Sequence, residues 1–182
     1  MHWADVIAEQ LAKRGDSHVI ATGITPSGPI HVGNMREVLT ADMVVRACER
    51  IGLDAELVYI ADSADPLRKI YPFLDAEVYS NFVGHSLATI PSPDGDGAYS
   101  DFFLRPFFSA LDDLGVEYRV VDAYASYQEG KYTDATKSAI SNRKEISEII
   151  QEVSQRPLDD DWFPYNPVDE DGNMHGLKVT AC

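Results

Sequence analysis

The chain of 182 residues has few cysteines, no long apolar stretch and half as many basic as acidic residues. Its two cysteines, Cys48 and Cys182, are too few for a disulfide framework and fit a reducing compartment. No apolar run approaches the roughly 20 residues that a membrane-spanning helix needs. The first residues lack the basic start, apolar stretch and cleavage site of a signal peptide. We therefore expect a soluble, cytoplasmic protein that does not bind membranes.

The shortage of basic residues limits the possible partners. Fifteen Lys and Arg against 30 Asp and Glu give a formal net charge of −15. Such a surface repels polyanions over long range, so nucleic-acid binding would need a local basic patch. Solubility, or adaptation to salt, is the simpler interpretation of the charge. One cluster of basic and aromatic residues could contact the single-stranded end of a nucleic acid, although a charged helix face with core tyrosines is equally consistent with it: Tyr127, Lys131, Tyr132 and Lys137.

The first part of the chain alternates between helix and strand patterns, and its 45% hydrophobic content is that of a globular domain. Residues 3–14 have helical spacing, residues 18–24 indicate a buried strand, residues 35–51 a helix and residues 55–62 a second strand. This order predicts a βαβ unit in a parallel sheet, and hence an α/β fold of the nucleotide-binding type. The side chains expected on the buried face of the first helix are Trp3, Val6, Ile7 and Leu11. Those expected on the buried face of the second are Val38, Leu39, Met43, Val44, Ala47 and Ile51.

The second part of the chain continues the same alternation. A helix is expected over 102–114, a third strand over 117–124 and one long helix over 133–155. Asp171-Gly172 suggests a hairpin that returns through 177–181. Because that strand-like pattern runs to the last residues, we expect the chain to be a fragment of a longer protein. The apolar residues expected on the buried stripe of the long helix are Ala139, Ile140, Ile146, Ile149, Ile150 and Val153.

The loop in residues 22–37, TGITPSGPIHVGNMRE, is the strongest candidate for a ligand site. It follows a strand and precedes a helix, where ligands bind in open α/β sheets and where free N–H groups suit a phosphate. His31 can donate a hydrogen bond to a phosphoryl oxygen. Two glycines allow close approach of a ligand and two prolines stiffen the loop, namely Gly28, Gly33, Pro26 and Pro29. The spacing matches neither the dinucleotide fingerprint nor the P-loop, so a phosphate site and a well-made turn remain equal alternatives.

A resemblance to a known family favours the phosphate site. HVGN, residues 31–34, resembles the HIGH signature of class I aminoacyl-tRNA synthetases and related nucleotidyltransferases. The longer stretch 22–37 resembles the class I lysyl-tRNA synthetases of archaea and some bacteria, in which Asn commonly takes the last place of the signature. Four more stretches resemble the same family: HWADVIAEQL, ADSADPLRKIYPFL, YQEGKYTDATKSAI and PYNPV. The resemblance covers essentially the whole chain. It implies a Rossmann-like parallel sheet of the class I synthetase type, with a connective segment inserted from about residue 86.

The resemblance also implies a reaction and its residues. Lysine would be activated by ATP, with Mg²⁺, to lysyl-adenylate and then transferred to tRNA(Lys). His31 and Asn34 would be catalytic, stabilising charge in the transition state by position and electrostatics. The implied ATP-binding residues are Pro26, Ser27, Gly28, His31, Val32, Gly33 and Asn34. Gly23, Thr25 and Asp62 would lie beside the lysine.

The lysine site has an open alternative at its acidic residues. Asp62 and Asp65 follow the second predicted strand and could meet an ammonium group or a ribose. Asp beside a proline-containing turn is more often a turn or cap residue, and that is the simpler interpretation.

The chain departs from the family at its metal sites. Many relatives have Cys and His zinc ligands in the loop that corresponds to 90–103, but this chain has neither residue type from 86 to 174. We expect this loop to fold without metal. Cys182 stands where relatives begin a second metal cluster, and its partners would lie beyond the chain. Zinc is therefore expected only in a full-length protein.

The chain also ends before two parts of the family pattern, the KMSKS-type loop and the C-terminal anticodon-binding domain. We expect an N-terminal catalytic fragment that is inactive alone and a tRNA affinity that comes mainly from the missing part. Two other hypotheses stay open. One is a different HIGH-type nucleotidyltransferase, whose nucleotide binding would be indifferent to lysine. The other is a truncated, non-catalytic paralogue, which a KMSKS-like motif further along the parent gene would contradict.

Overall fold

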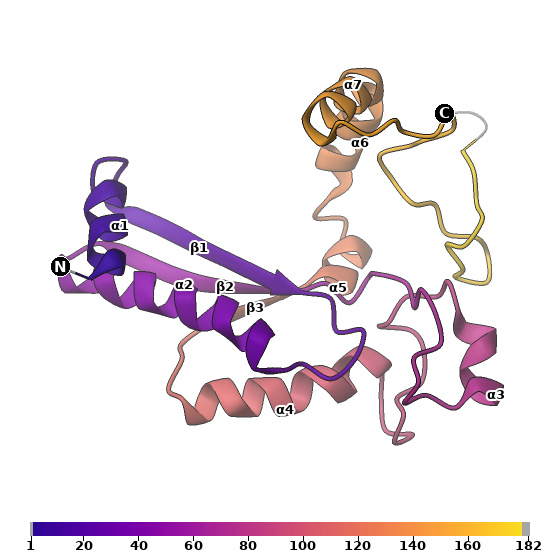
Figure 1. Ribbon diagram of the computed structural model, residues 1–182, viewed down its shortest axis with the longest axis horizontal. Coiled ribbons are helices and arrows are strands. Elements are labelled where there is room, and N and C mark those ends of the chain that lie inside the picture. The colour runs from indigo at the N-terminus through magenta and orange to yellow at the C-terminus, as the bar shows by residue number, and fades with distance from the viewer. Residues whose placement is uncertain (1, 180–182) are drawn as a thin grey trace. The chain divides into compact units, whose positions relative to one another are not determined.

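The computed structural model describes residues 2–179, and the chain divides into two compact units (Figure 1). Unit 1 is formed by Met1–Asp65 and Leu87–Tyr124, and unit 2 by Pro66–Ser86 and Ala125–Cys182. Each unit is thus assembled from two segments that are not contiguous in the sequence.

Unit 1 contains a parallel sheet of three strands in the order β1-β2-β3. The strands are β1 (Ser17–Ile24), β2 (Asp54–Ala61) and β3 (Arg119–Asp122). Helix α2 (Val32–Arg50) connects the first two strands, which pair in parallel along their whole length. The predicted βαβ unit and α/β fold are confirmed. The carboxyl ends of all three strands meet at one edge of the sheet, because the pairing is parallel throughout.

Helices α2 and α4 (Tyr99–Asp113) cover the same face of this sheet (Figure 1). The ring of Tyr59 on β2 lies at the centre of the core, 5.5 Å from the ring of Phe107 and 5.4 Å from that of Phe108. Burying each large apolar side chain here contributes about 1.5–3 kcal/mol. The buried residues of the cluster are Val38, Ala41, Val45, Leu57, Tyr59, Ala61, Leu104, Phe107, Leu111 and Val116.

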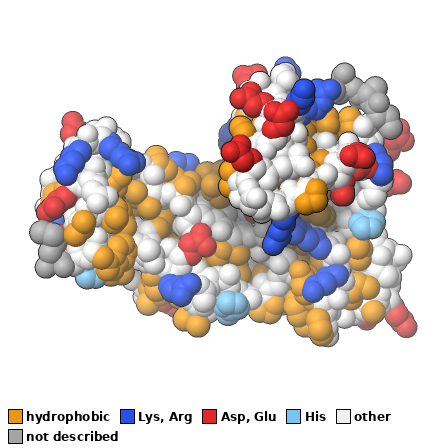
Figure 2. Space-filling view, turned by 45° about the horizontal axis from the view of Figure 1, so that its top comes forward, with side chains coloured by type: hydrophobic (Ala, Val, Ile, Leu, Met, Phe, Trp, Pro, Cys, Tyr) orange, Lys and Arg blue, Asp and Glu red, His pale blue; other side chains and the backbone are white. Residues whose placement is uncertain are grey.

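Strand β1 is not the buried strand that its apolar sequence predicts. Ile20 and Ile24 pack against the core, whereas Val19 on the opposite side is 60% exposed. The strand lies at an edge of the described sheet, and the two helices cover only one of its faces. Figure 2 shows hydrophobic side chains at the surface toward the α1 end of unit 1. A run of β-branched residues predicts a strand correctly but does not show whether one or both of its faces are covered.

Helix α1 (Trp3–Leu11) forms where it is predicted but buries a different face. Ala4 and Ala8 are fully buried, while Trp3, Val6 and Ile7 are exposed. The predicted buried face is therefore wrong except for Leu11, which is partly buried against the cluster around Ala4 and Ala8. The small alanines let α1 lie close to α2, against Val44, Ala47 and Cys48. The prediction failed because it assigned the buried face to the largest side chains, and a close helix contact needs the smallest.

The buried face of α2 is also turned relative to the prediction. Val38, Val44 and Ala47 are buried as expected, but Met43 and Ile51 are exposed. Their places are taken by Ala41, Val45 and Cys48, which face the sheet and α1. Cys48 is fully buried on this face.

The third strand is shorter than expected. The predicted strand over 117–124 is reduced to β3 (Arg119–Asp122), and the chain turns at once into helix α5 (Ala123–Gln128). Ser63 accounts for this turn, because its buried hydroxyl donates to Asp122 Oδ2 (2.8 Å) and accepts from the backbone N of Tyr124 (3.2 Å). The helix predicted over 102–114 is confirmed as α4, which begins three residues earlier.

Unit 2 contains the short helices α3 (Ala76–Tyr79) and η1 (Ser80–Phe82), followed later in the chain by α6 (Thr133–Ser141) and α7 (Arg143–Ser154). The single helix predicted over 133–155 is wrong, because the chain breaks at Asn142, whose side chain donates to the backbone O of Ser138 (2.8 Å). The predicted stripe is not buried either. Within α6 and α7, which lie wholly in the described part, no side chain is buried, and Val153 is 79% exposed.

The turn at Asp171-Gly172 exists, but it does not open the predicted hairpin. The backbone N of Gly172 donates to Asp169 O (3.1 Å), and the strand-like bridge that follows pairs Asn173 with His85. No strand occurs over 174–179, the described part of the expected return; residues 180 and 181 lie outside it. A Cβ on Gly84 would come within 2.2 Å of Asn173 Oδ1, so this contact requires glycine.

Candidate active site

His31 and Asn34 cap the start of α2 reciprocally. The backbone N of Gly33 donates to His31 Nδ1 (3.0 Å), and the backbone N of His31 donates to Asn34 Oδ1 (3.3 Å). These bonds satisfy two of the N–H groups that a helix start leaves without partners. His31 and Asn34, the two residues predicted to be catalytic, are therefore brought together by this helix cap. Its hydrogen bonds to the backbone also fix both side chains.

The cap determines which nitrogen of His31 can act on a ligand. Because Nδ1 accepts a hydrogen bond, a neutral imidazole carries its proton on Nε2, which is then a donor. The imidazole also needs a glycine beneath it, since a Cβ on Gly33 would lie 2.8 Å from His31 Cε1. Val32 lies between His31 and Gly33 in the sequence, but its side chain is 82% exposed and does not restrain the imidazole.

The loop before this cap is held from beneath. Pro26 is buried, and the hydroxyl of the buried Tyr99 on α4 donates to the backbone O of Ser27 (2.8 Å). The backbone N of Ser27 in turn donates to Thr25 O (2.8 Å). Ser27 and Gly28 are half-buried. This loop is therefore a fixed element of unit 1.

Thr25 and two aspartates meet at the carboxyl edge of the sheet. The Thr25 hydroxyl lies 3.3 Å from Asp62 Oδ2 and 3.2 Å from Asp65 Oδ2. The single proton of the hydroxyl serves one carboxylate at a time. The backbone N of Asp62 donates to Ile24 O (3.1 Å), which continues the β1–β2 pairing to this point. The structure thus brings together two of the residues expected beside lysine, with Asp65 added.

Gly23, the third residue expected there, has a packing role on β1. A Cβ at this position would lie 2.7 Å from Ile60 O on the neighbouring strand. Its backbone N donates to Glu37 Oε1 (3.0 Å), and the same oxygen accepts from the hydroxyl of Thr22. The need for glycine is explained by the strand pairing without any ligand.

Comparison with known proteins identifies the family. The profile of the family described as tRNA synthetases class I (K) matches residues 1–181. The chain belongs to this class I tRNA synthetase family.

Individual relatives agree along the same length. The chain is 50% identical to lysine–tRNA ligase 1 of Methanosarcina acetivorans and 50% identical to the lysine–tRNA ligase of Archaeoglobus fulgidus, with 100% of this chain covered in both. It is 48% identical over 98% of its length to the lysine–tRNA ligase of Methanocaldococcus jannaschii. These alignments cover 34%, 37% and 34% of the three relatives, so the chain spans about a third of their length.

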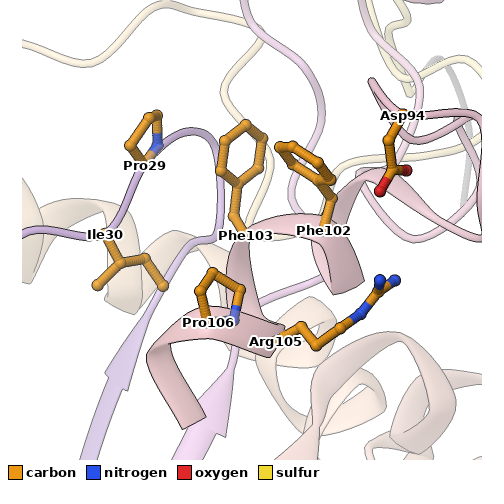
Figure 3. Close-up of a pocket in the computed structure, with 7 residues that line it drawn as sticks. All are labelled: Pro29, Ile30, Asp94, Phe102, Phe103, Arg105 and Pro106. Carbon is orange, nitrogen blue, oxygen red and sulfur yellow. The ribbon is translucent and has the colours of Figure 1, made fainter. Parts of the chain in front are cut away.

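A pocket of about 390 Å³ lies beside the loop that precedes α2 in this synthetase chain (Figure 3). Pro29 and Ile30 of the loop form one side, and Asp94 and Arg105 lie toward the other (Figure 3). The carboxylate of Asp94 accepts from the hydroxyl of Ser92, which holds the pKa of Asp94 below its usual value. The rest of the lining comes from α4, namely Phe102, Phe103 and Pro106. None of the residues predicted to bind ATP or lysine lines this pocket.

The cluster considered for nucleic-acid contact lies in unit 2 of the synthetase chain, and its tyrosines are not the core residues of the alternative interpretation. The rings of Tyr127 and Tyr132 are 4.6 Å apart in an edge-to-face arrangement, and Tyr127 is half exposed, so it is no core residue. Lys131 pairs with Glu129 at 2.5 Å, which offsets its charge locally. Lys137 is exposed on α6.

Two further sequence expectations concern metals and membranes. Cys182, the possible zinc ligand, lies outside the described residues. Among residues 2–179, no three or more His, Cys, Asp or Glu side chains gather as a metal ion would require. The helices of the same part include none that is both long and apolar enough to cross a bilayer.

Sequence reasoning missed two residues that hold the candidate site in place, Glu37 and Tyr99. Glu37 bonds to residues 14 and 15 positions earlier, and Tyr99 to a residue 72 positions earlier. Neither contact follows a local spacing rule, because both depend on how α2 and α4 pack on the sheet. The sequence contains one signal for Glu37, its position three residues after the HVGN stretch, and none for Tyr99.

Proposed function

We propose that the chain is part of a lysine–tRNA ligase that activates lysine with ATP and transfers the lysyl group from lysyl-adenylate to tRNA(Lys). The carrying observation is the His31–Asn34 cap at the start of α2, beside the carboxyl ends of parallel strands. Identity of 50% over the whole chain to proteins named lysine–tRNA ligase supports the choice of lysine.

His31 and Asn34 act on the phosphates of ATP in this proposal. A carboxylate oxygen of lysine attacks the α-phosphorus, the bond to the β-phosphate oxygen breaks, and pyrophosphate leaves. Negative charge on the phosphoryl oxygens is stabilised by the Nε2–H of His31 and by the amide nitrogen of Asn34, whose Oδ1 is already held by the cap. Backbone groups complete the ATP site at the helix start, from Pro26, Ser27, Gly28, Val32 and Gly33.

Lysine lies at the end of β1 in the same proposal. Gly23 and Thr25 border it, and the carboxylate of Asp62 pairs with an ammonium group. The hydrogen bonds of the Thr25 hydroxyl support this assignment, because they place the carboxylates of Asp62 and Asp65 close together at the carboxyl ends of the strands. Negative charge there suits an ammonium group. A pure turn role for the two aspartates predicts instead that Asp62→Asn leaves the lysine KM unchanged.

Mg²⁺ enters with ATP and is held mainly by phosphates and water, as is usual for this ion. Zinc is expected only in a longer protein, through Cys182 and partners outside this chain. The net charge of −15 supports a tRNA contact made mainly by parts outside these 182 residues. We propose a cytoplasmic location, and a domain organisation in which residues 1–182 form the N-terminal part of a catalytic domain with a connective insertion from about residue 86.

Lysine-dependent exchange between ATP and labelled pyrophosphate tests the function. The assay is run on this chain and on the full reading frame that encodes it, with arginine and ornithine as control amino acids. We expect exchange with lysine from the longer protein and little from the 182-residue chain. Exchange with another amino acid but not with lysine would overturn the substrate, and nucleotide exchange independent of any amino acid would indicate another HIGH-type nucleotidyltransferase.

A further inference from the structure

Glu37 forms a bridge between the end of β1 and the second turn of α2. Its Oε1 atom accepts a hydrogen bond from the backbone N of Gly23 (3.0 Å) and another from the hydroxyl of Thr22. Thr22 is buried, so its hydroxyl needs such an acceptor. One oxygen of one side chain thus joins two consecutive residues of the strand to the helix.

This bridge spans the two halves of the proposed site. Gly23 and Thr25 border the lysine at the end of β1, and His31 and Asn34 lie at the start of the helix to which Glu37 belongs. Between Ile24 and Val32 the two elements are connected by seven residues of loop. A shift of α2 along the strand would change the distance between attacking carboxylate and α-phosphorus, and in-line displacement tolerates little such change.

The charge of Glu37 offers a second interpretation. In the described part of the chain no cationic side chain pairs with it, and a lysine ammonium could do so. The two interpretations differ in what they need. The bridge needs only an oxygen acceptor, which an amide provides, whereas an ammonium site needs the carboxylate. Oε1 of Glu37 already accepts two hydrogen bonds from β1, one from the Thr22 hydroxyl and one from the backbone N of Gly23, and this favours the bridge.

We propose that Glu37 is a positioning residue, which holds the lysine subsite at the end of β1 in register with the phosphate subsite at the start of α2. The inference rests on the proposed function, because it assigns Glu37 a part in aligning the two substrates of that reaction. Glu37 touches neither substrate and acts through Thr22 and Gly23.

The test compares Glu37→Gln and Glu37→Ala in the full reading frame. The control is Glu49→Ala, which removes the same charge from an exposed position on the same helix. Pyrophosphate exchange gives kcat and the KM for lysine and for ATP. We expect Glu37→Ala to lower kcat on the order of tenfold or more, with both KM values within about twofold of the wild type. Glu37→Gln keeps most of the activity, and Glu49→Ala keeps all of it.

Other results would overturn the proposal. A Glu37→Gln variant as impaired as Glu37→Ala, with a raised KM for lysine, would assign Glu37 to the ammonium. Full activity of Glu37→Ala would leave the bridge without a role. If Glu37→Ala fails to fold, Thr22→Val replaces it as the test variant, because valine lacks the hydroxyl donor but keeps the side-chain volume. Thr22→Ser keeps the hydroxyl and is its control. We expect the loss of kcat in Thr22→Val and not in Thr22→Ser.

Amide exchange separates this inference from the function itself. Absence of lysine-dependent exchange in the wild type would defeat the proposed function. Hydrogen exchange at the Gly23 amide, followed by NMR, still reports on the bridge. We expect faster exchange at Gly23 in Glu37→Ala and wild-type exchange in Glu37→Gln, and equal exchange in all three proteins would overturn the bridge independently of activity.

Discussion

The imidazole of His31 lies over the backbone of Gly33, at a place where a Cβ on residue 33 would come within 2.8 Å of the ring. The Gly33 amide donates to the same ring through Nδ1. The histidine and the glycine of the HVGN stretch therefore form one unit, in which the glycine makes room for the ring and fixes its tautomer. This relationship explains why the spacing H-x-G at a helix start leaves Nε2 as the donor.

Two substitutions of His31 separate the helix cap from the ligand. Asparagine retains a good capping acceptor but has no group at the place of Nε2, whereas alanine lacks both. We expect both variants of the full reading frame to lose adenylation activity on the order of tenfold or more. Only His31→Ala should also lose stability, by about 1 kcal/mol in urea unfolding. Normal exchange kinetics in His31→Asn would remove the phosphate role from the imidazole.

Substitution of Gly33 tests the space under the ring. In Gly33→Ala the new methyl group forces the imidazole away from its position over the helix start, so the cap and the direction of Nε2 are lost together. We expect an activity loss similar to that of His31→Ala. Glu49→Ala, at an exposed position near the end of the same helix, is the control and should leave pyrophosphate exchange unchanged. Equal activities for the two variants would contradict the contact.

Gly23 should be required for folding as well as for activity. A methyl group at this position meets the backbone O of Ile60 at 2.7 Å, which must separate β1 from β2 locally. We expect Gly23→Ala to destabilise the chain by about 1–3 kcal/mol in urea unfolding. Ile60→Ala should give no rescue, because the nearest atom belongs to the backbone. Ala21→Ser, two residues earlier on the same face of β1, is the control, and recovery by Ile60→Ala would contradict the prediction.

The thiol of Cys48 should be unreactive in the folded chain. It is fully buried between α1, α2 and the sheet, and burial raises its pKa. In a Cys182→Ser background, we expect Ellman's reagent to label Cys48 only on the time scale of unfolding. Rapid labelling under native conditions would contradict the packing of α1 through Ala4 and Ala8.

Tyr118 should make stability depend on alkaline pH. Burial, followed by its hydrogen bond to Asp112 and the charge of that carboxylate, raises the pKa of Tyr118 to about 12. The fold therefore favours the neutral phenol. This stabilisation is complete below the unfolded pKa of about 10 and is lost as pH rises toward 12. Urea unfolding between pH 9 and 11.5 should show a smaller decline in Tyr118→Phe than in the wild type, and parallel declines would contradict the shift.

The parts of the fold that follow a local pattern were predictable from the sequence. The strand and helix periods gave the βαβ unit, and the resemblance around HVGN located the loop. The cap itself follows from the order His-x-x-Asn at a helix start, a variant of the capping box. These features depend on residues within a few positions of one another.

The failures share one cause, which is that the sequence pattern contains no information on what covers a face. The large apolar residues of α1 were predicted to form its buried face, but Ala4 and Ala8 form it instead, because α2 lies so close. The stripe over 133–155 has helical period, yet the chain breaks at Asn142 and the stripe is not buried. Glu37 was missed for the same reason, since its partners lie on another element.

The contact of Asn173 with the loop at Gly84 has a consequence for synthesis. Asn173 Nδ2 donates to Val83 O, 90 residues earlier in the chain. A ribosome needs roughly 5–20 s to translate that interval, during which residues 66–86 have emerged without the segment that closes over them. The β1–α2–β2 unit has all its parts within the first 61 residues and can form meanwhile. Nascent unit 2 is therefore the part most exposed to chaperones and proteases, and it becomes protected only after Asn173 has left the ribosome.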